Sequence, residues 1–302
     1  MQIGMIGLGK MGANMARRLK RGGVEVVGFD QDPAGLAALV KEGVIKSAAS
    51  LAALVQSLQA PRLVWVMLPS GAPTESTVSE LKKLLARGDT LIDGANGHFA
   101  DSQRHARELA ELGIGFVDIG VSGGIWGLEI GYGLMIGGAK ADVAKVESIA
   151  KILAPKPDEG WLHCGPAGAG HYVKMVHNGI EYGLMQAYAE GFALMQARED
   201  MQLDIAKIAE SWRHGTVIRS WLLDLTAEFL KQDAKLEGVA PFVADSGEGR
   251  WTALEAIQRG VPTPVMNLAV LARFSSQGKG DFGSRILAKM RQAFGGHAIK
   301  AK

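Results

Sequence analysis

Three glycines stand between a short apolar run and a helical pattern at the start of the chain. Gly7, Gly9 and Gly12 have the spacing GxGxxG, with "MQIGMI" before them and "ANMARRLKRGG" after them. A second apolar run, "VEVVGFD", ends at Asp30. A strand, this turn, a helix and an acid about 20 residues on form the context in which the spacing binds a dinucleotide. We therefore expect a βαβ unit that holds a pyrophosphate at the helix N-terminus, with an ordinary strand-turn-helix unit as the alternative.

Asp30 bears on which dinucleotide binds. A carboxylate at the end of the second strand accepts hydrogen bonds from the ribose hydroxyls and repels a 2′-phosphate. The chain continues as "DQDPAG", with no arginine directly after the acid. The sequence therefore predicts NAD rather than NADP.

Strand and helix patterns alternate up to about residue 164. Alternation of this kind predicts a mostly parallel sheet, whose ligands bind at the carboxyl ends of the strands. "DGANGH" and "GVSGG" follow two of the predicted strands, so Asn96 and Ser122 are candidate hydrogen-bonding residues. Capping of a helix or loop is the alternative for each.

After residue 164 the patterns are helical, and the first helix is expected to run for about 30 residues, or about 45 Å at the rise of an α-helix. The predicted fold class is α/β, a Rossmann-type dinucleotide-binding domain over residues 1–164 followed by an all-α domain over residues 165–302. The net charge of +2 is too small to indicate binding to nucleic acid or membranes. A single cysteine, the absence of a signal-peptide pattern and the lack of a long apolar run predict a cytoplasmic protein without a disulfide framework or a zinc site.

Five polar residues share one face of the long predicted helix. Lys174, His177, Asn178, Glu181 and Tyr182 recur at positions i, i+3, i+4, i+7 and i+8. A lysine whose pKa is depressed by burial acts as a base, and a glutamate whose pKa is raised acts as an acid. The spacing is therefore compatible with catalysis, and a solvated helix face is the alternative.

The strings "KMVHNGIEYG", "GPAGAGH", "DGAN" and "GVSGGIWG" resemble the decarboxylating 6-phosphogluconate dehydrogenase family, in its short form. The resemblance covers nearly the whole chain. The wider β-hydroxyacid dehydrogenases share the Ser-Gly-Gly loop and a helix lysine with an asparagine four residues on, but they lack the full polar stripe.

The resemblance implies a catalytic role for two residues. Lys174 would take the proton of the substrate 3-hydroxyl while a hydride leaves C3 for NAD, and Glu181 would protonate the enediol after CO2 is lost, which gives ribulose 5-phosphate. Residues implied to bind the substrate are Asn96, Ser122, Gly123, Gly124, His177, Asn178, Tyr182, Arg250, Thr252, Arg273, Arg291 and His297. Residues implied to bind the cofactor are Gly7, Leu8, Gly9, Lys10, Met11, Gly12, Asp30, Met67, Leu68 and Asn96.

The C-terminal string "RQAFGGH" resembles the family's tail, whose arginine and histidine reach the neighbouring subunit's site. Here these are Arg291 and His297, so a homodimer or homotetramer is implied; a frayed basic terminus is the alternative. The chain departs from the family at Arg250, where lysine is common, and at Gly97, where serine is usual. Asp30 also departs from the asparagine-arginine pair of NADP-dependent members, which again favours NAD.

Two other functions are alternatives to the one that this resemblance implies. A β-hydroxyacid dehydrogenase could act on a small unphosphorylated acid without decarboxylation, but such a substrate needs one arginine rather than the three at 250, 273 and 291. A dinucleotide-binding sensor without turnover would have no use for a base and an acid on one helix.

Overall fold

The computed structural model describes residues 1–295 and 298–300. The chain forms two compact units, Met1–Met175 and Val176–Lys302. The sequence patterns predicted a boundary near residue 164, whereas the structure divides the chain inside helix α8 (Ala169–Gln196). The physical reason is that the first turn of α8 packs directly on strands of the first unit, as described below.

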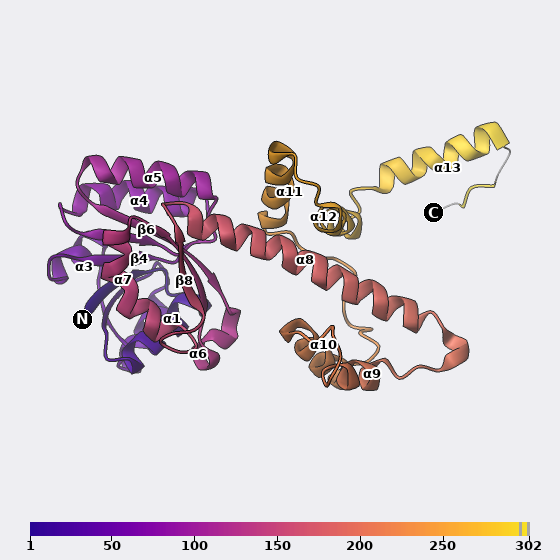
Figure 1. Ribbon diagram of the computed structural model, residues 1–302, viewed down its shortest axis with the longest axis horizontal. Coiled ribbons are helices and arrows are strands. Elements are labelled where there is room, and N and C mark those ends of the chain that lie inside the picture. The colour runs from indigo at the N-terminus through magenta and orange to yellow at the C-terminus, as the bar shows by residue number, and fades with distance from the viewer. Residues whose placement is uncertain (296–297, 301–302) are drawn as a thin grey trace. The chain divides into compact units, whose positions relative to one another are not determined.

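The first unit is built on an eight-stranded sheet in the order β3-β2-β1-β4-β5-β6-β7-β8 (Figure 1). Neighbouring strands are parallel except for β6 and β7, which are antiparallel. The order reverses between β1 and β4, the point where an open α/β sheet binds its ligand. The strands are β1 (Gln2–Ile6), β2 (Glu25–Phe29), β3 (Ile45–Ser47), β4 (Leu63–Val66), β5 (Thr90–Asp93), β6 (Gly115–Ser122), β7 (Gly133–Gly138) and β8 (Trp161–Gly165).

Helices cover both faces of this sheet, because its strands are apolar on both sides. Met15 of α1 and Ile149 of α7 pack with Trp65 on one face, while Leu81 of α4 and Leu109 of α5 pack on the other (Figure 1). The helices of the first unit are α1 (Lys10–Arg21), α2 (Pro33–Lys41), α3 (Leu51–Ser57), α4 (Ala72–Leu84), α5 (Phe99–Glu111), the 3₁₀ turn η1 (Gly124–Trp126), α6 (Gly127–Ile130) and α7 (Lys140–Leu153). The predicted α/β class is confirmed.

The second unit is helical. Tyr182 packs with Ala269 and Val270, and Ala209 packs with Ala227 in a second small cluster. After α8 come η2 (Glu199–Met201), α9 (Ile205–Trp212), α10 (Trp221–Gln232), α11 (Glu248–Arg259), α12 (Pro264–Ser276) and α13 (Asp281–Gly295). Within the described parts of the chain, no helix is both long and apolar enough to span a membrane.

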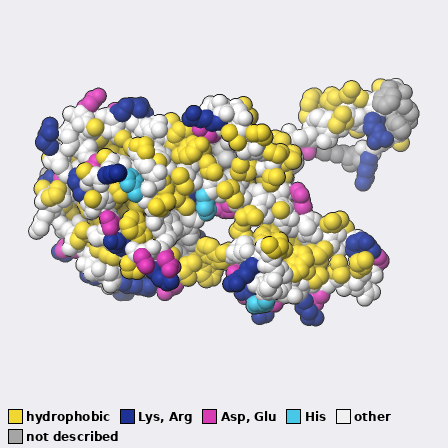
Figure 2. Space-filling model, viewed as in Figure 1, with side chains coloured by type: hydrophobic (Ala, Val, Ile, Leu, Met, Phe, Trp, Pro, Cys, Tyr) yellow, Lys and Arg dark blue, Asp and Glu magenta, His cyan; other side chains and the backbone are white. Residues whose placement is uncertain are grey.

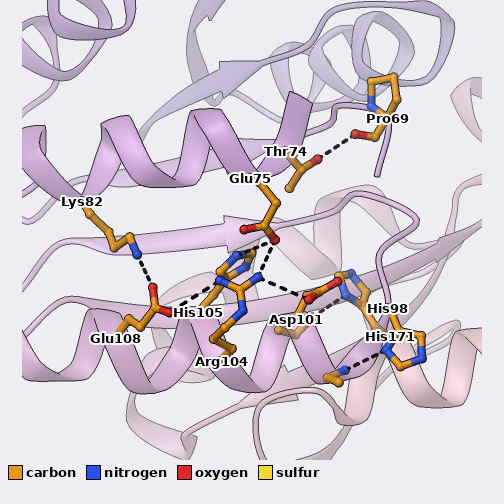
Figure 3. A network of polar contacts seen from close by, with 12 residues as sticks. Pro69, Thr74, Glu75, Lys82, His98, Asp101, Arg104, His105, Glu108 and His171 are labelled. Carbon is orange, nitrogen blue, oxygen red and sulfur yellow. Dashed lines mark hydrogen bonds and ion pairs between the residues drawn. The ribbon is translucent and has the colours of Figure 1, made fainter. Parts of the chain in front are cut away.

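A network of charges joins α4 to α5 in the first unit (Figure 3). Arg104 donates to Glu75 at 2.6 Å and to Asp101 at 3.2 Å, and Nε2 of the buried His105 lies 3.0 Å from Oε1 of Glu75. Burial acts to raise the pKa of Glu75, but the hydrogen bonds from Arg104 and His105 outweigh it and lower that pKa below its ordinary 4.5. The carboxylate therefore stabilises the fold above its unfolded-state pKa, and this contribution is lost as the pH falls through the folded-state pKa.

Glu75→Gln is expected to lower the melting temperature by about 2–4 °C at pH 7, because solvent screening at this half-exposed ion pair limits the loss to about 1 kcal/mol. Thermal melts between pH 7 and pH 3 check this. The difference in melting temperature between variant and wild type should shrink as the pH falls below 4.5. Glu80→Gln, at an exposed position of the same helix, is the control; a difference that stays constant with pH would refute the assignment.

Candidate active site

The glycine-rich turn lies at the topological switch point, between the ends of β1 and β4. Gly7 has φ +89°, and a Cβ there would lie 2.4 Å from the Met67 carbonyl oxygen; a Cβ on Gly12 would lie 2.0 Å from the Gly7 oxygen. Packing within the protein therefore requires both glycines. Gly9 differs, since no described atom lies within 4 Å of the position of its Cβ. Its missing side chain leaves space next to the backbone, which is what close approach of a pyrophosphate needs.

Helix α1 begins directly after this glycine. Gly9 is its N-cap and offers no side chain to the first-turn N–H groups, and the first turn contains no acid. These donors and the helix dipole are suited to a phosphate. Leu68 packs beside Gly7, with Cδ2 2.9 Å from the position of a Cβ on that glycine, and the Met67 N–H donates to Ile6 at 2.7 Å. Lys10 is exposed and Met11 half-buried beside this turn.

Asp30 follows β2 and is tied to the same turn. Its Oδ2 accepts from the Leu8 N–H at 2.5 Å, and its Oδ1 accepts from the Asp32 N–H at 2.8 Å. Asp32 caps α2 by accepting from the Ala34 N–H at 3.0 Å. Two carboxylates therefore lie at the end of β2, and both repel any further negative charge that approaches there.

The turns after β5 and β6 carry the other predicted residues of the first unit. Asn96 is exposed in the turn after β5, and Gly97 lies beside the ring of His171. Ser122 ends β6 and is half-buried; Gly123 and Gly124 then have φ of +125° and +52°, a backbone that favours glycine. The structure thus places Asn96 and Ser122 at the carboxyl ends of adjacent strands, as the sequence predicted.

Lys174 lies on the first turns of α8 with its side chain packed on the sheet. A Cβ on Gly120 of β6 would lie 2.3 Å from the Lys174 Cβ, and Lys174 is only 7% exposed. The apolar neighbours Val173 and Ile180 on the same helix are 38% and 53% exposed. A solvated face would show the opposite arrangement, so that alternative is wrong at Lys174.

The rest of the stripe lies in the second unit on the same helix. His177 Nδ1 contacts Asn178 Oδ1 at 3.0 Å and lies 4.0 Å from Glu181 Oε2, and both His177 and Glu181 are half-buried. Tyr182 is buried, and its hydroxyl lies 3.3 Å from Ser246 Oγ. The helix therefore places an imidazole, an amide and a carboxylate within one stretch of two turns.

Two arginines of the second unit contact residues that directly precede α11. The guanidinium carbon of Arg273 lies 3.4 Å from the centroid of the Tyr182 ring, and its Nη1 donates to the Ala244 carbonyl at 3.0 Å. Arg250 pairs with Asp245 at 2.7 Å. Thr252 is buried beside Gly179, with Cγ2 2.6 Å from the position of a Cβ there. Arg291 is exposed on α13, and His297 lies outside the described residues.

Sequence reasoning missed several buried polar residues behind this site. Asp93, Asp118 and His171 are almost completely buried in the first unit. Burial raises the pKa of Asp93, although the charge of His171 acts against it. For Asp93 and Asp118, the signal in the sequence was an acid inside each apolar run, "TLIDG" and "GFVDIG".

Known protein families match both parts of the chain. The family described as the NAD binding domain of 6-phosphogluconate dehydrogenase matches residues 2–161, and the family described as the C-terminal domain of 6-phosphogluconate dehydrogenase matches residues 170–298. The chain belongs to the 6-phosphogluconate dehydrogenase family. The resemblance inferred from the sequence is therefore confirmed.

Individual relatives differ in length. The chain is 39% identical over 303 residues to the NAD(+)-dependent, decarboxylating 6-phosphogluconate dehydrogenase of Haloferax volcanii, covering 100% of this chain and 99% of that one. It is 37% identical to the enzyme of the same name from Bacillus subtilis, covering 91% of this chain but 61% of that longer one. A solved Plasmodium falciparum 6-phosphogluconate dehydrogenase, studied with NADP+ and with 6-phosphogluconate, superposes with a TM-score of 0.85 at 28% identity, over 100% of this chain and 66% of that chain.

Proposed function

We propose that the protein oxidises and decarboxylates 6-phospho-D-gluconate to D-ribulose 5-phosphate and CO2, with NAD as the hydride acceptor. The observation that carries this is the burial of Lys174 against Gly120, at the start of a helix face that also bears His177, Asn178 and Glu181. The full-length similarity to a decarboxylating, NAD(+)-dependent relative supports the same substrate and cofactor.

Lys174 is the base in this proposal. Its amine takes the proton of the 3-hydroxyl, and the residue that carries it is only 7% exposed. NAD, when bound, supplies the acceptor for the hydride that leaves C3. The product is a β-keto acid, so the C1–C2 bond breaks, CO2 leaves, and the electron pair passes to the oxygen on C3. Protonated Lys174 stabilises that oxygen.

Glu181 completes the reaction. It lies seven residues beyond Lys174, two turns along the same helix face. In this proposal its carboxyl donates a proton to the enediol carbon that lost CO2, which yields the ketose product. Asn96, Ser122, Gly123, Gly124, His177 and Asn178 hold the sugar acid, while Tyr182, Arg250, Thr252 and Arg273 serve its phosphate end.

The cofactor site in this proposal consists of the glycine turn and its neighbours. The open backbone at Gly9 and the uncapped N-terminus of α1 support a pyrophosphate there. Leu8, Lys10, Met11, Met67 and Leu68 line the turn, and Asp30 accepts from the ribose hydroxyls. The negative charges of Asp30 and Asp32 support NAD over NADP.

Asp30→Asn tests this preference, because the amide keeps one oxygen that can accept from the Leu8 N–H but loses the negative charge and the acceptor for the Asp32 N–H. A hydrogen bond to a charged group is worth roughly 1.5–3 kcal/mol, so the ratio of kcat/KM with NAD to that with NADP should fall by about tenfold or more. Steady-state kinetics with both cofactors give the ratio. An unchanged or higher ratio would remove Asp30 from the ribose contact.

Assembly into a homodimer or homotetramer belongs to the proposal. Val173, Ile180 and Leu184 form an exposed apolar stripe on α8, and hydrophobic side chains gather over α9, α10 and α13 in Figure 2. Large exposed apolar patches typically mark interfaces. In the assembly we propose, Arg291 and His297 of one chain complete the site of its neighbour.

A panel of substrates separates this proposal from the alternative dehydrogenase. Purified protein is given NAD with 6-phosphogluconate, gluconate or 3-hydroxyisobutyrate, and reduction of the nicotinamide is followed by absorbance. We expect reduction with the sugar phosphate at a kcat/KM at least about 100-fold above the other two, because the phosphate contacts are charge-assisted. Preferential oxidation of the small acid would overturn the proposal.

A further inference from the structure

Asp118 of β6 is a fully buried carboxylate that reaches across to another element. Its Oδ1 accepts from the Gly168 N–H at 2.7 Å, and its Oδ2 accepts from the His171 N–H at 2.9 Å. These donors lie at the cap and the third residue of α8, where N–H groups have no partner within the helix. A buried carboxylate is costly unless it is satisfied, and two N–H groups with the positive end of a helix dipole satisfy it.

Three glycines bring the same turn of α8 close to the sheet. A Cβ on Gly170 would lie 2.4 Å from the Met135 oxygen, and one on Gly137 would lie 2.6 Å from the Gly170 nitrogen. A Cβ on Gly120 would meet the Cβ of Lys174. No other residue type fits at these contacts without displacing the backbone, so the helix start is pressed onto β6 and β7.

Alternation along β6 relates these contacts to the candidate active site. Asp118, Gly120 and Ser122 are two residues apart, so they lie on one face of the strand. Asp118 accepts hydrogen bonds from the N-terminus of α8, Gly120 packs against Lys174, and Ser122 is predicted to bind the substrate. One strand face therefore sets the position of Lys174 relative to Ser122.

We propose that Asp118 is a positioning residue for Lys174. Its two oxygens bind N–H groups three residues apart, so they define both where α8 begins and how it is rotated about its axis. Rotation matters because successive residues of an α-helix are about 100° apart. The side chain of His171 adds a further tie, with Nδ1 2.7 Å from Ser102 Oγ of α5. The proposal rests on the proposed role of Lys174 as the base.

Asp118→Asn is the test. The amide keeps one acceptor oxygen but turns an NH2 group toward the other N–H, so one cap bond is lost. We expect kcat with 6-phosphogluconate and NAD to fall by about 10–100-fold, since a displacement of the order of 1 Å costs about 10²-fold. The Kd for NAD should stay within about twofold, because the glycine turn is untouched.

Asp89→Asn is the matched control. Asp89 is also buried, and its carboxylate accepts from the Arg62 and Ala86 N–H groups at 2.7 and 2.9 Å. It precedes β5, at the amino end of the sheet. Both variants should lower the melting temperature, but only Asp118→Asn should lower kcat. An equal loss of kcat in both, or a kcat within about twofold of wild type in folded Asp118→Asn, would overturn the proposal.

A double-mutant cycle decides whether Asp118 acts through Lys174. In a Lys174→Met background, Asp118→Asn should cause no further loss of kcat, because the group that it positions is gone. Multiplicative losses would contradict the proposal. If wild-type protein does not turn over 6-phosphogluconate, the proposed function has failed, and amide hydrogen exchange of residues 168–175 still tests the cap: exchange unchanged in Asp118→Asn would overturn it.

A second variant applies if Asp118→Asn does not fold. Gly120→Ala keeps the Asp118 carboxylate, and its methyl group would press on the Lys174 Cβ at 2.3 Å and on the Gly170 carbonyl oxygen at 2.9 Å. It should lower kcat by at least about tenfold with unchanged NAD affinity, and a kcat equal to wild type would show that the contact with β6 does not set the position of Lys174.

Discussion

Lys174→Met is expected to lower turnover by about 10²–10⁴-fold, the usual scale for loss of an acid–base group. Methionine keeps most of the apolar stem that packs on Gly120, so the fold should persist. NAD binding should remain nearly intact, because the glycine turn and Asp30 lie on other elements. The measurements are kcat with 6-phosphogluconate and NAD affinity by fluorescence titration.

Lys151→Met is the control for this substitution. Lys151 lies on α7, is partly exposed and pairs with Glu147 at 2.6 Å, so its loss should leave kcat within about twofold, as surface changes usually do. Near-wild-type turnover of Lys174→Met would remove Lys174 from its role as base.

Glu181→Gln has the second largest expected effect. The amide has the same shape but cannot donate an acidic proton, so formation of ribulose 5-phosphate should slow by about 10²-fold or more. Hydride transfer precedes this step. In rapid-quench experiments on the first turnover, NADH and CO2 should therefore form before ribulose 5-phosphate does.

Glu190→Gln is the matched control, because Glu190 lies on the same helix and accepts from Gln186 at 2.8 Å. It should match wild type at every step. Unchanged rates throughout in Glu181→Gln would refute the proton-donor assignment.

Local patterns predicted much of the fold and of the candidate site. The GxGxxG turn, the strand ends at Asn96 and Ser122 and the long helix through Lys174 follow from periodicity and spacing, which act over a few residues. The structure adds that Lys174 is buried while Val173 is exposed, a reversal of the usual preference that supports a functional reason for the lysine.

Long-range contacts could not be predicted in this way. Glycines interrupt the apolar run "GYGLMIGG" of β7, and its antiparallel pairing with β6 does not follow from the alternation of strand and helix, which predicts parallel neighbours. The cap of α8 by Asp118 joins residues 50 positions apart. The boundary between the units also depends on a long-range contact: it falls inside α8 because the first turn of that helix packs on β6 and β7.

In the function we propose, one site both oxidises and decarboxylates the sugar acid. The most direct test of this function uses 6-phosphogluconate labelled at the carboxyl carbon, with purified protein and NAD, and measures labelled CO2 and NADH together. We expect one CO2 for each NADH, with both lost in Lys174→Met. NADH formed without CO2 would contradict the proposed function and would identify a dehydrogenase that does not decarboxylate its substrate.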